Sequence, residues 1–445
     1  AVFTGRGSKL NTLLLTLRTC RVIIILHAPV LCAGPSASWG EGGTVTKVER
    51  RFFDFVQKHL PVFLAVAATL CGLLIRFAGK DFQSGDFVSF LNPWWSQIQE
   101  GGLAALKNQV GNYNIPYQVI IYILTLFPLK SLYAYKLLSV VFDFVLAFAA
   151  GLLVGELTGK KSPFVFSLTY AVVFCSITVC FNSAFWAQCD SIYVAFILLS
   201  LYYLLRRKHI AAFALLGVAL AFKLQTVFVL PVYLYDYVTT RKTSILHFLI
   251  APAVDVLMCL PVVFLGRNPA DIIRIYIEQT DYGKYIQMNC PNFYAILCNG
   301  DESANYFLLK NASVALTVLI LGIGLCMLIY KKVDLSDKNK FMLSAIWSVF
   351  TCLMFLSSMH ERYGYLLDVL VIIYVIAVRK RYWLAVACNL VSLRGYCQYM
   401  FKYSVDIRLT AYVYFAVYVY VSYLFLREVI SDRAQNTPPM AKKKC

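Results

Sequence analysis

The chain has 445 residues, of which 60% are hydrophobic and only 14% are charged. About a quarter of the residues of a soluble domain are charged, so this composition excludes an ordinary soluble globular protein. The net charge of +18 does not by itself indicate nucleic-acid binding, because basic residues also flank membrane helices on the cytoplasmic side. We therefore expect an all-α polytopic membrane protein with no nucleic-acid partner.

The first 44 residues differ from the rest of the chain. The stretch "GPSASWGEGG" at 34–43 has the composition of a linker. Gly-Glu-Gly-Gly shortly before Val45 is what a purine-rich ribosome-binding site and a GTG start codon would give if translated. We expect 1–44 to be a non-native or disordered extension, 45–430 an integral membrane domain and 431–445 a basic cytoplasmic tail. The alternative for the first part is a signal-like segment, "VIIILHAPVLCAG".

Long apolar runs recur from residue 59 onward. About 20 apolar residues span the hydrocarbon layer of a bilayer as a helix, and these runs are too long for barrel strands. The sequence predicts about twelve membrane-spanning helices, and a shorter apolar piece at 116–129 that lies on the surface. The predicted spans are 59–78, 132–156, 163–181, 190–205, 209–222, 224–238, 243–265, 306–330, 341–357, 364–378, 382–398 and 409–427.

Basic residues collect in alternate loops of this twelve-span arrangement. By the positive-inside rule those loops are cytoplasmic, and both termini fall on the same side. The loop with Arg394, Lys402 and Arg408 is mildly basic and departs from the pattern. The basic groups lie at 47–51, 160–161, 206–208, 241–242, 331–340, 379–381 and 427–444.

Four polar segments remain on the opposite, outer face. They are 79–115, the loop around 186–188, 266–305 and 360–363. Because four separate stretches of chain meet on one face, we expect an extracytoplasmic active site there.

The first outer segment contains "SGDFVSFLNPWWSQIQEGG" at 84–102. Gly85 would allow a tight turn there. The stretch after it is typical of an amphipathic interfacial helix, with Trp94 and Trp95 as headgroup-level anchors. Asp86 is either an ordinary solvated acid in a polar loop or a general base held near the membrane.

Three further stretches carry candidate polar groups. Asp190 either caps the next helix or, with Gln188, orients a sugar hydroxyl. Lys223 lies in an apolar context and either snorkels to the interface or reaches a lipid phosphate. Gln225 is two residues further on and points elsewhere on a helix. Asp143 is a buried acid for which Lys136 is a candidate partner.

The hairpin "SSMHERYGYLLD" at 357–368 is the most polar connection between two spans. His360 and Arg362 are donors suited to a phosphate clamp, since Arg offers a planar fork of N–H groups. Glu361 would pair with Arg362 or Lys223 and hold the cations in place. Tyr363 either touches substrate or anchors the helix at the headgroups. The alternative is a short connector whose charges neutralise one another.

Competing chemistry has little support in the sequence. There is no phosphate-binding GxxxxGK[ST], HExxH or GxSxG motif, and no CxxC pair. We expect no metal and no cofactor, although Asp86 with Asp190 is conceivable as a metal site. Cys290 and Cys298 share one polar loop and either form a disulfide or remain two thiols.

Several of these motifs together resemble a known family. They are, in chain order, GDF at 85–87, YNIPY at 113–117, residues 136–143, WAQCDS at 186–191, FKLQ at 222–225 with Pro231, and MHERY at 359–363. Over roughly 48–427 the chain resembles the bacterial membrane mannosyltransferases related to the eukaryotic glycosylphosphatidylinositol second mannosyltransferase, within the GT-C superfamily. It resembles more distantly the glucosyltransferases that extend lipid-linked oligosaccharide. The family has Gly where this chain has Ala187, and often two prolines where this chain has Pro116.

The resemblance implies a GT-C-like fold and an inverting glycosyltransferase. Such an enzyme would move a hexose, mannose first and glucose next, from a polyprenyl-phosphate donor to a glycan or lipid acceptor on the extracytoplasmic side of a membrane, the bacterial plasma membrane favoured. It further implies that Asp86 is the base and that His360, Arg362 and Lys223 bind the donor phosphate. The alternatives are a transporter or flippase, and a ligase-type enzyme that joins polymers.

Overall fold

The computed structural model describes residues 46–280, 285–298, 305–403 and 405–431. The chain separates into two compact units, residues 1–63 and 64–445. The described part of the first unit is the amino-terminal portion of helix α2 (Lys47–Ala78). This helix begins twelve residues before the predicted span, because Thr46 and Glu49 form a reciprocal capping box at its start.

The second unit is almost entirely helical in its described part. After α2 the elements are η1 (Phe87–Leu91), α3 (Asn92–Ala105), α4 (Ile115–Thr125), α5 (Ser131–Thr158), α6 (Pro163–Phe174), α7 (Ile177–Cys180), η2 (Phe181–Phe185), α8 (Asp190–Leu205), α9 (His209–Phe222), η3 (Leu224–Val229), α10 (Leu230–Thr240), η4 (Ile245–Leu249) and α11 (Ile250–Phe264). They continue with α12 (Asp271–Thr280), β1 (Gln287–Met288), α13 (Phe293–Leu297), α14 (Tyr306–Tyr330), α15 (Lys338–Phe355), β2 (Met359–His360), α16 (Tyr365–Val378), α17 (Tyr382–Phe401), α18 (Ile407–Leu424) and η6 (Phe425–Ile430).

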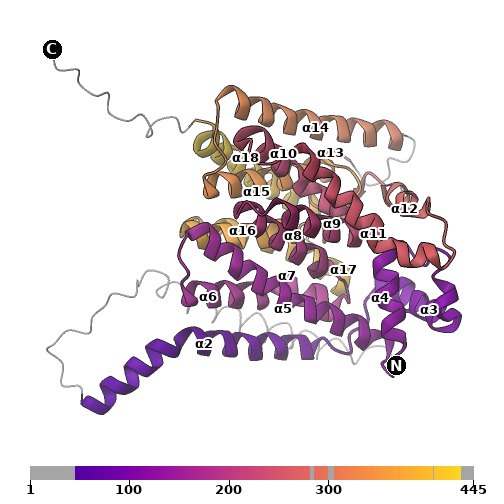
Figure 1. Cartoon of the computed structure of the whole chain (residues 1–445), viewed down its shortest axis with the longest axis horizontal. Helices are drawn as coiled ribbons and strands as arrows, with labels where there is room; N and C mark the ends of the chain where they lie inside the picture. The colour runs from indigo at the N-terminus through magenta and orange to yellow at the C-terminus, as the bar shows by residue number, and fades with distance from the viewer. Residues whose placement is uncertain (1–45, 281–284, 299–304, 404, 432–445) are drawn as a thin grey trace. The chain divides into compact units, whose positions relative to one another are not determined.

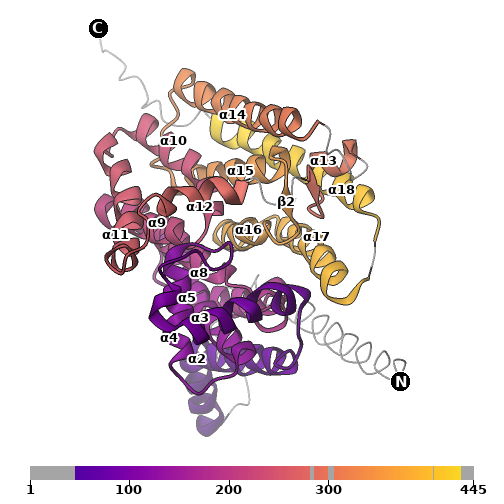
Figure 2. The ribbon, with the colours of Figure 1, turned by 90° about the vertical axis from the view of Figure 1, so that its right-hand side faces the viewer.

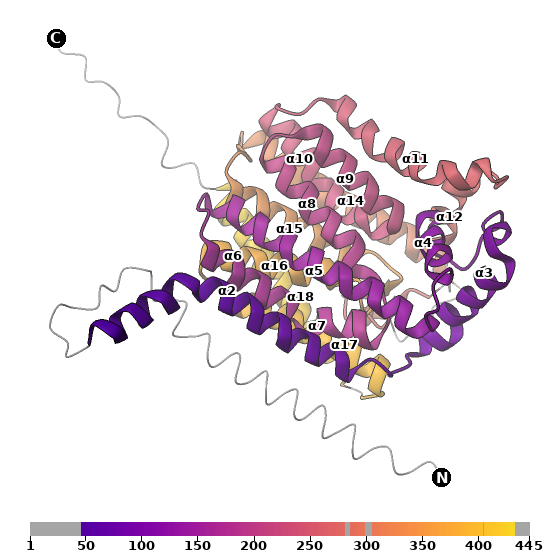
Figure 3. The ribbon, with the colours of Figure 1, turned by 60° about the horizontal axis from the view of Figure 1, so that its bottom comes forward.

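The long helices of this unit run side by side, with α5 packed on α6 and α8, α8 on α9, and α9 on α11 (Figure 1). Helices α15, α16 and α17 follow one another in a second row. Helices α3, α4 and α12 gather at one end of the long helices (Figure 3). Figure 2 is seen from that end and shows β2 between α16, α17 and α13.

Five helices of the described part are long and apolar enough to cross a membrane, or six if the bent pair α6 and α7–η2 forms one span. Four shorter apolar helices, α4, α8, α9 and α16, accompany them. Each predicted span coincides with one or more observed helices, and α8, α9 and α14 have the predicted bounds. The helical class is therefore confirmed. The predictions for 1–44 and for the tail beyond residue 431 lie outside the described residues.

The buried acid Asp143 on α5 does not pair with Lys136. Its Oδ2 accepts hydrogen bonds from Arg76 (2.9 Å) on α2 and from Ser183 (2.6 Å) on η2. Lys136 instead donates to the carbonyl oxygens of Gly79, Lys80 and Phe82 where the chain leaves α2. These two sets of contacts fix the end of α2 against α5, and so place the segment that begins at Ser84.

The segment after α2 differs in part from the predicted interfacial helix. Its helix is α3, which follows the π-helical turn η1. Trp95 is not a headgroup anchor, because it is buried and packs on Tyr135. Trp94 packs edge-on against Tyr113 and covers Gly111, whose missing side chain makes room for the indole.

Candidate active site

A cavity of about 550 Å³ lies in the second unit. Four stretches that are far apart in the sequence contribute to its walls: the turn at η1, the loop before α8, the break between α9 and η3, and the hairpin between α15 and α16. The predicted site residues that line it are Asp86, Gln188, Lys223, Gln225, His360, Glu361, Arg362 and Tyr363. Asp190 is buried next to this set and bonds to Lys223.

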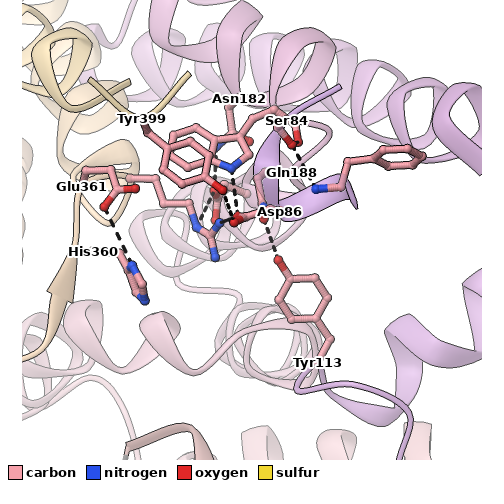
Figure 4. A network of polar contacts seen from close by, with 12 residues as sticks. Ser84, Asp86, Tyr113, Asn182, Gln188, His360, Glu361 and Tyr399 are labelled. Atoms are coloured by element: carbon pink, nitrogen blue, oxygen red, sulfur yellow. Dashed lines mark hydrogen bonds and ion pairs between the residues drawn. The ribbon is translucent and has the colours of Figure 1, made fainter. Parts of the chain in front are cut away.

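The carboxylate of Asp86 is the meeting point of these segments (Figure 4). Its Oδ2 accepts hydrogen bonds from Trp186 Nε1 (2.9 Å), Gln188 Nε2 (2.8 Å) and Arg362 Nη1 (2.9 Å). Its Oδ1 accepts one from the hydroxyl of Tyr399 on α17 (2.5 Å). Asp86 is therefore a positioned group and not an ordinary solvated loop acid.

The electrostatics of Asp86 follow from these contacts. Burial by itself raises the pKa of the carboxyl group. The positive charge of Arg362, together with the hydrogen bonds from Tyr399, Trp186 and Arg362, outweighs burial, so the pKa lies below its usual range. Asp86 is thus ionised at neutral pH.

The backbone before Asp86 is held by Ser84. Its hydroxyl donates to the carbonyl oxygen of Trp186 (2.9 Å) and accepts from the N–H of Phe87 (3.1 Å). The turn itself does not need glycine, because Gly85 is not among the described glycines with positive φ. A Cβ at Gly85 would instead lie 2.9 Å from the Tyr399 hydroxyl oxygen, so the glycine provides space.

Asp190 and Lys223 form a second, buried ion pair. Lys223 donates to Asp190 Oδ1, and Asn182 Nδ2 donates to Asp190 Oδ2 (2.6 Å). The N-cap of α8 is Cys189 and Asp190 is the first residue of the helix, so the N-cap alternative for Asp190 is wrong. Arg362 Nε lies 4.0 Å from Asp190 Oδ2, and the two ion pairs are therefore neighbours.

Gln188 connects Asp86 to the loop before α4. Its Nε2 donates to Asp86, and its Oε1 accepts from the hydroxyl of Tyr113 (2.6 Å). The preceding residue, Ala187, has a φ of 62°, a left-handed conformation that is costly for any side chain with a Cβ. Glycine would adopt this conformation without that cost.

The helix breaks at Lys223. Lys223 is extended (φ −156°, ψ 131°), and the following 3₁₀ segment η3 leads to Pro231 in the first turn of α10. Proline has no N–H for a bond to the carbonyl four residues earlier, so Pro231 is suited to the first turn of a new helix. The expectation that Lys223 and Gln225 point apart on one helix is wrong, because both line the cavity.

The hairpin residues are fixed by the two-residue parallel pairing of β1 with β2, in which Gln287 faces Met359 and Met288 faces His360. Glu361 does not pair with Arg362 or Lys223, which bond to Asp86 and Asp190. Its carboxylate lies 3.8 Å from the His360 ring.

Tyr363 packs edge-on against His360 and lines the cavity. It is half-buried, and partial burial with nearby carboxylates raises its pKa to about 12. It is therefore a neutral hydroxyl at neutral pH. Its position on the cavity wall places it where a bound molecule would touch it.

Sequence reasoning missed four contributors to this network. Trp186, Tyr113 and Asn182 lie in or beside segments already singled out, and their aromatic and amide groups were a usable signal. Tyr399 belongs to no motif, and its one signal is indirect, the glycine at residue 85 beside which its hydroxyl lies. It stacks on Trp186 with ring centroids 4.3 Å apart and planes 9° apart.

The arrangement combines a fixed carboxylate with two cations at one cavity. Arg362 uses Nη1 on Asp86 and its Nε lies 4.0 Å from Asp190 Oδ2, so only the N–H groups of its two terminal nitrogens that do not bond Asp86 are left for an anionic oxygen. Among the described residues no cluster of three or more His, Cys, Asp or Glu side chains is arranged to hold a metal ion. Cys290 has a free thiol, so the disulfide alternative with Cys298 is wrong.

Comparison with known protein families finds no family whose pattern matches this chain, and no curated protein matches it.

Proposed function

We propose that the chain is a GT-C-type glycosyltransferase of about twelve spans, which moves a hexose, mannose favoured, from a polyprenyl-phosphate donor to a glycan or lipid acceptor on the outer face of a membrane. The observation that carries the proposal is that Asp86, Arg362 and Lys223, from three distant segments, meet at one cavity. A carboxylate next to two cations suits the transfer of a group from a phosphate to a hydroxyl. Both termini are then cytoplasmic, as the basic loops indicate.

The reaction is a single displacement. The acceptor oxygen forms a bond to the anomeric carbon, the bond from that carbon to the phosphate oxygen breaks, and its electron pair leaves with the polyprenyl phosphate. Arg362, Lys223 and His360 stabilise the charge on the leaving phosphate, and removing one such donor typically costs ~10²–10³ in rate. Because attack comes from the opposite face, the configuration at the anomeric carbon inverts.

Asp86 accepts the proton of the acceptor hydroxyl, a contribution of about 10²–10⁴ in rate. Since its pKa lies below the usual range, it is a weak base. The proton therefore moves late, after bond formation to the anomeric carbon has made the hydroxyl acidic. The ion pair with Arg362 keeps the base ionised and aimed before substrate arrives.

The test uses purified protein in lipid nanodiscs with radiolabelled polyprenyl-phosphate-mannose or polyprenyl-phosphate-glucose, and acceptors extracted from membranes. We expect donor consumption and a labelled product, both abolished by Asp86→Asn, which should still bind donor. Asp81→Asn is the matched control, because Asp81 lies exposed five residues earlier and outside the cavity. An intact donor in every reaction, as for a transporter, or full turnover by Asp86→Asn would overturn the proposal.

A further inference from the structure

The two oxygens of the Asp86 carboxylate accept different numbers of hydrogen bonds. Oδ2 accepts three hydrogen bonds, from Trp186, Gln188 and Arg362, and has no room for a further donor. Oδ1 accepts one, from Tyr399. A carboxylate oxygen offers about two lone-pair directions. The lone pair that remains for an incoming hydroxyl is therefore on Oδ1, beside the Tyr399 hydroxyl.

Gly85 makes the contact between Tyr399 and Asp86 possible. A Cβ at this position would lie 2.9 Å from the Tyr399 hydroxyl oxygen and 3.6 Å from the ring carbon that carries it. The first distance is too short for an unshifted structure, and the second is ordinary van der Waals contact. Since Gly85 is not in the left-handed region, the space it leaves for this hydroxyl is the physical reason for glycine here.

Tyr399 has little freedom to move. Its ring lies flat on Trp186, and the Trp186 indole N–H is bonded to Oδ2 of the same carboxylate. The stacked pair thus holds Asp86 by both oxygens, one from each ring. If the Tyr399 hydroxyl were pushed aside, it would lose its hydrogen bond to Oδ1. The ring cannot shift to restore the bond without giving up its stacking on Trp186.

We propose that Tyr399 is a positioning residue, which holds Asp86 so that the open lone pair of Oδ1 faces the acceptor hydroxyl, and that Gly85 provides the space for it. This inference rests on the proposed function, in which Asp86 is the base. Tyr399 does not take the proton itself. It sets the direction from which the acceptor hydroxyl approaches Asp86.

The test is a double-mutant cycle between the two positions, read out as kcat and as the pH dependence of kcat/KM. Tyr399→Phe should lower kcat about tenfold, the effect of one lost hydrogen bond. Gly85→Ala should do the same, because its methyl group displaces the hydroxyl. In the Tyr399→Phe background, Gly85→Ala should cost less than about twofold, because the clashing oxygen is gone.

The pH profile distinguishes positioning from a merely structural role. The Tyr399 hydrogen bond lowers the pKa of Asp86, so its removal should move the acid limb of kcat/KM to higher pH in both single variants. Tyr396→Phe is the structural control: Tyr396 lies one turn earlier on α17 and also packs on Trp186, but its hydroxyl accepts from Asn182. In Tyr396→Phe, the acid limb of kcat/KM should stay at the wild-type pH.

A readout without activity separates this inference from the proposed function. The carbonyl stretch of protonated Asp86, identified by infrared difference against Asp86→Asn, gives the titration midpoint of the carboxyl group in the full-length protein. We expect a higher midpoint in Tyr399→Phe and Gly85→Ala. If the wild type transfers no sugar but both midpoints shift, the proposed function fails and the contact by which Tyr399 holds Asp86 stands. An unshifted midpoint, or additive effects of the two substitutions, refutes the role of Tyr399.

Discussion

The buried pair of Arg76 and Asp143 makes a quantitative prediction about stability. Replacing Asp143 by Leu should lower the free energy of unfolding by about 3–5 kcal/mol, the usual cost of leaving one partner of a buried ion pair without the other. Replacing both residues, Asp143 by Leu and Arg76 by Met, should restore most of this loss, because a well-packed apolar pair needs no desolvation of charge.

The magnitude follows from the burial and geometry of the pair. The side chains are 3% and 0% exposed, so solvent screens the interaction little. Arg76 Nε and Nη2 lie 2.9 and 2.8 Å from the same carboxylate oxygen. Without Asp143 the guanidinium keeps the carbonyl oxygens of Gly72 and Phe174 and the face of the Phe174 ring, none of which carries a negative charge. The expected loss in the free energy of unfolding is therefore that of a fully buried ion pair, without a reduction for solvent screening.

The measurement is unfolding by SDS in mixed micelles, followed by circular dichroism. Lys136→Met is the control, because Lys136 is the candidate partner for Asp143 that the sequence suggests. It should destabilise the protein by losing its carbonyl contacts, but its effect should add to that of Asp143→Leu, since distant sites without shared partners are additive. A coupling between residues 136 and 143, or none between 76 and 143, would contradict this account.

Three further predictions follow from the site. Ala187→Gly should raise stability by up to about 1 kcal/mol in thermal unfolding, because the relief of left-handed strain exceeds the entropy cost of glycine; a loss of stability would oppose this. Asp86 has a lowered pKa, so its contribution to stability is present above the ordinary carboxyl pKa of about 4 and is lost as pH falls through the folded value. The wild type should therefore lose more stability than Asp86→Asn on acidification. Parallel curves of stability against pH for the two proteins would refute this. Lys223→Met leaves Asp190 buried without its cation and should weaken donor binding in equilibrium titrations with polyprenyl-phosphate-mannose, whereas unchanged affinity would exclude Lys223 from the phosphate site.

Most helices could be predicted because the residues next to each end of the helix determine its boundary. Helices α8, α9 and α14 begin and end at the predicted residues, where an apolar run meets charged or polar side chains. The start of α2 was missed because its first turns are charged, and the signal there is a capping box and not hydrophobicity. Local composition thus predicts where a helix exists, and in α2 a capping box sets the start.

The partners of the buried charges could not be predicted in the same way. Hydropathy shows that Asp143 is buried, but three helices decide that Arg76 and not Lys136 meets it. Tyr399 is a sharper case, since it stands far from Asp86 in the sequence and in an apolar helix. Its only sequence signal was indirect, a glycine at residue 85 whose reason was spatial and not conformational.

The two ion pairs at the cavity bear on how a phosphate site can exist in an apolar protein. An unpaired cation in such surroundings is costly, and Arg362 and Lys223 each have a carboxylate partner, Asp86 and Asp190. On the proposed function, these acids hold the two cations in place before a substrate binds. An arriving phosphate then meets donors that need no reorganisation, which is the condition under which such groups stabilise a transition state most. Removing Asp190 should therefore harm donor binding although it repels a phosphate, because Lys223 would lose its position along with its partner.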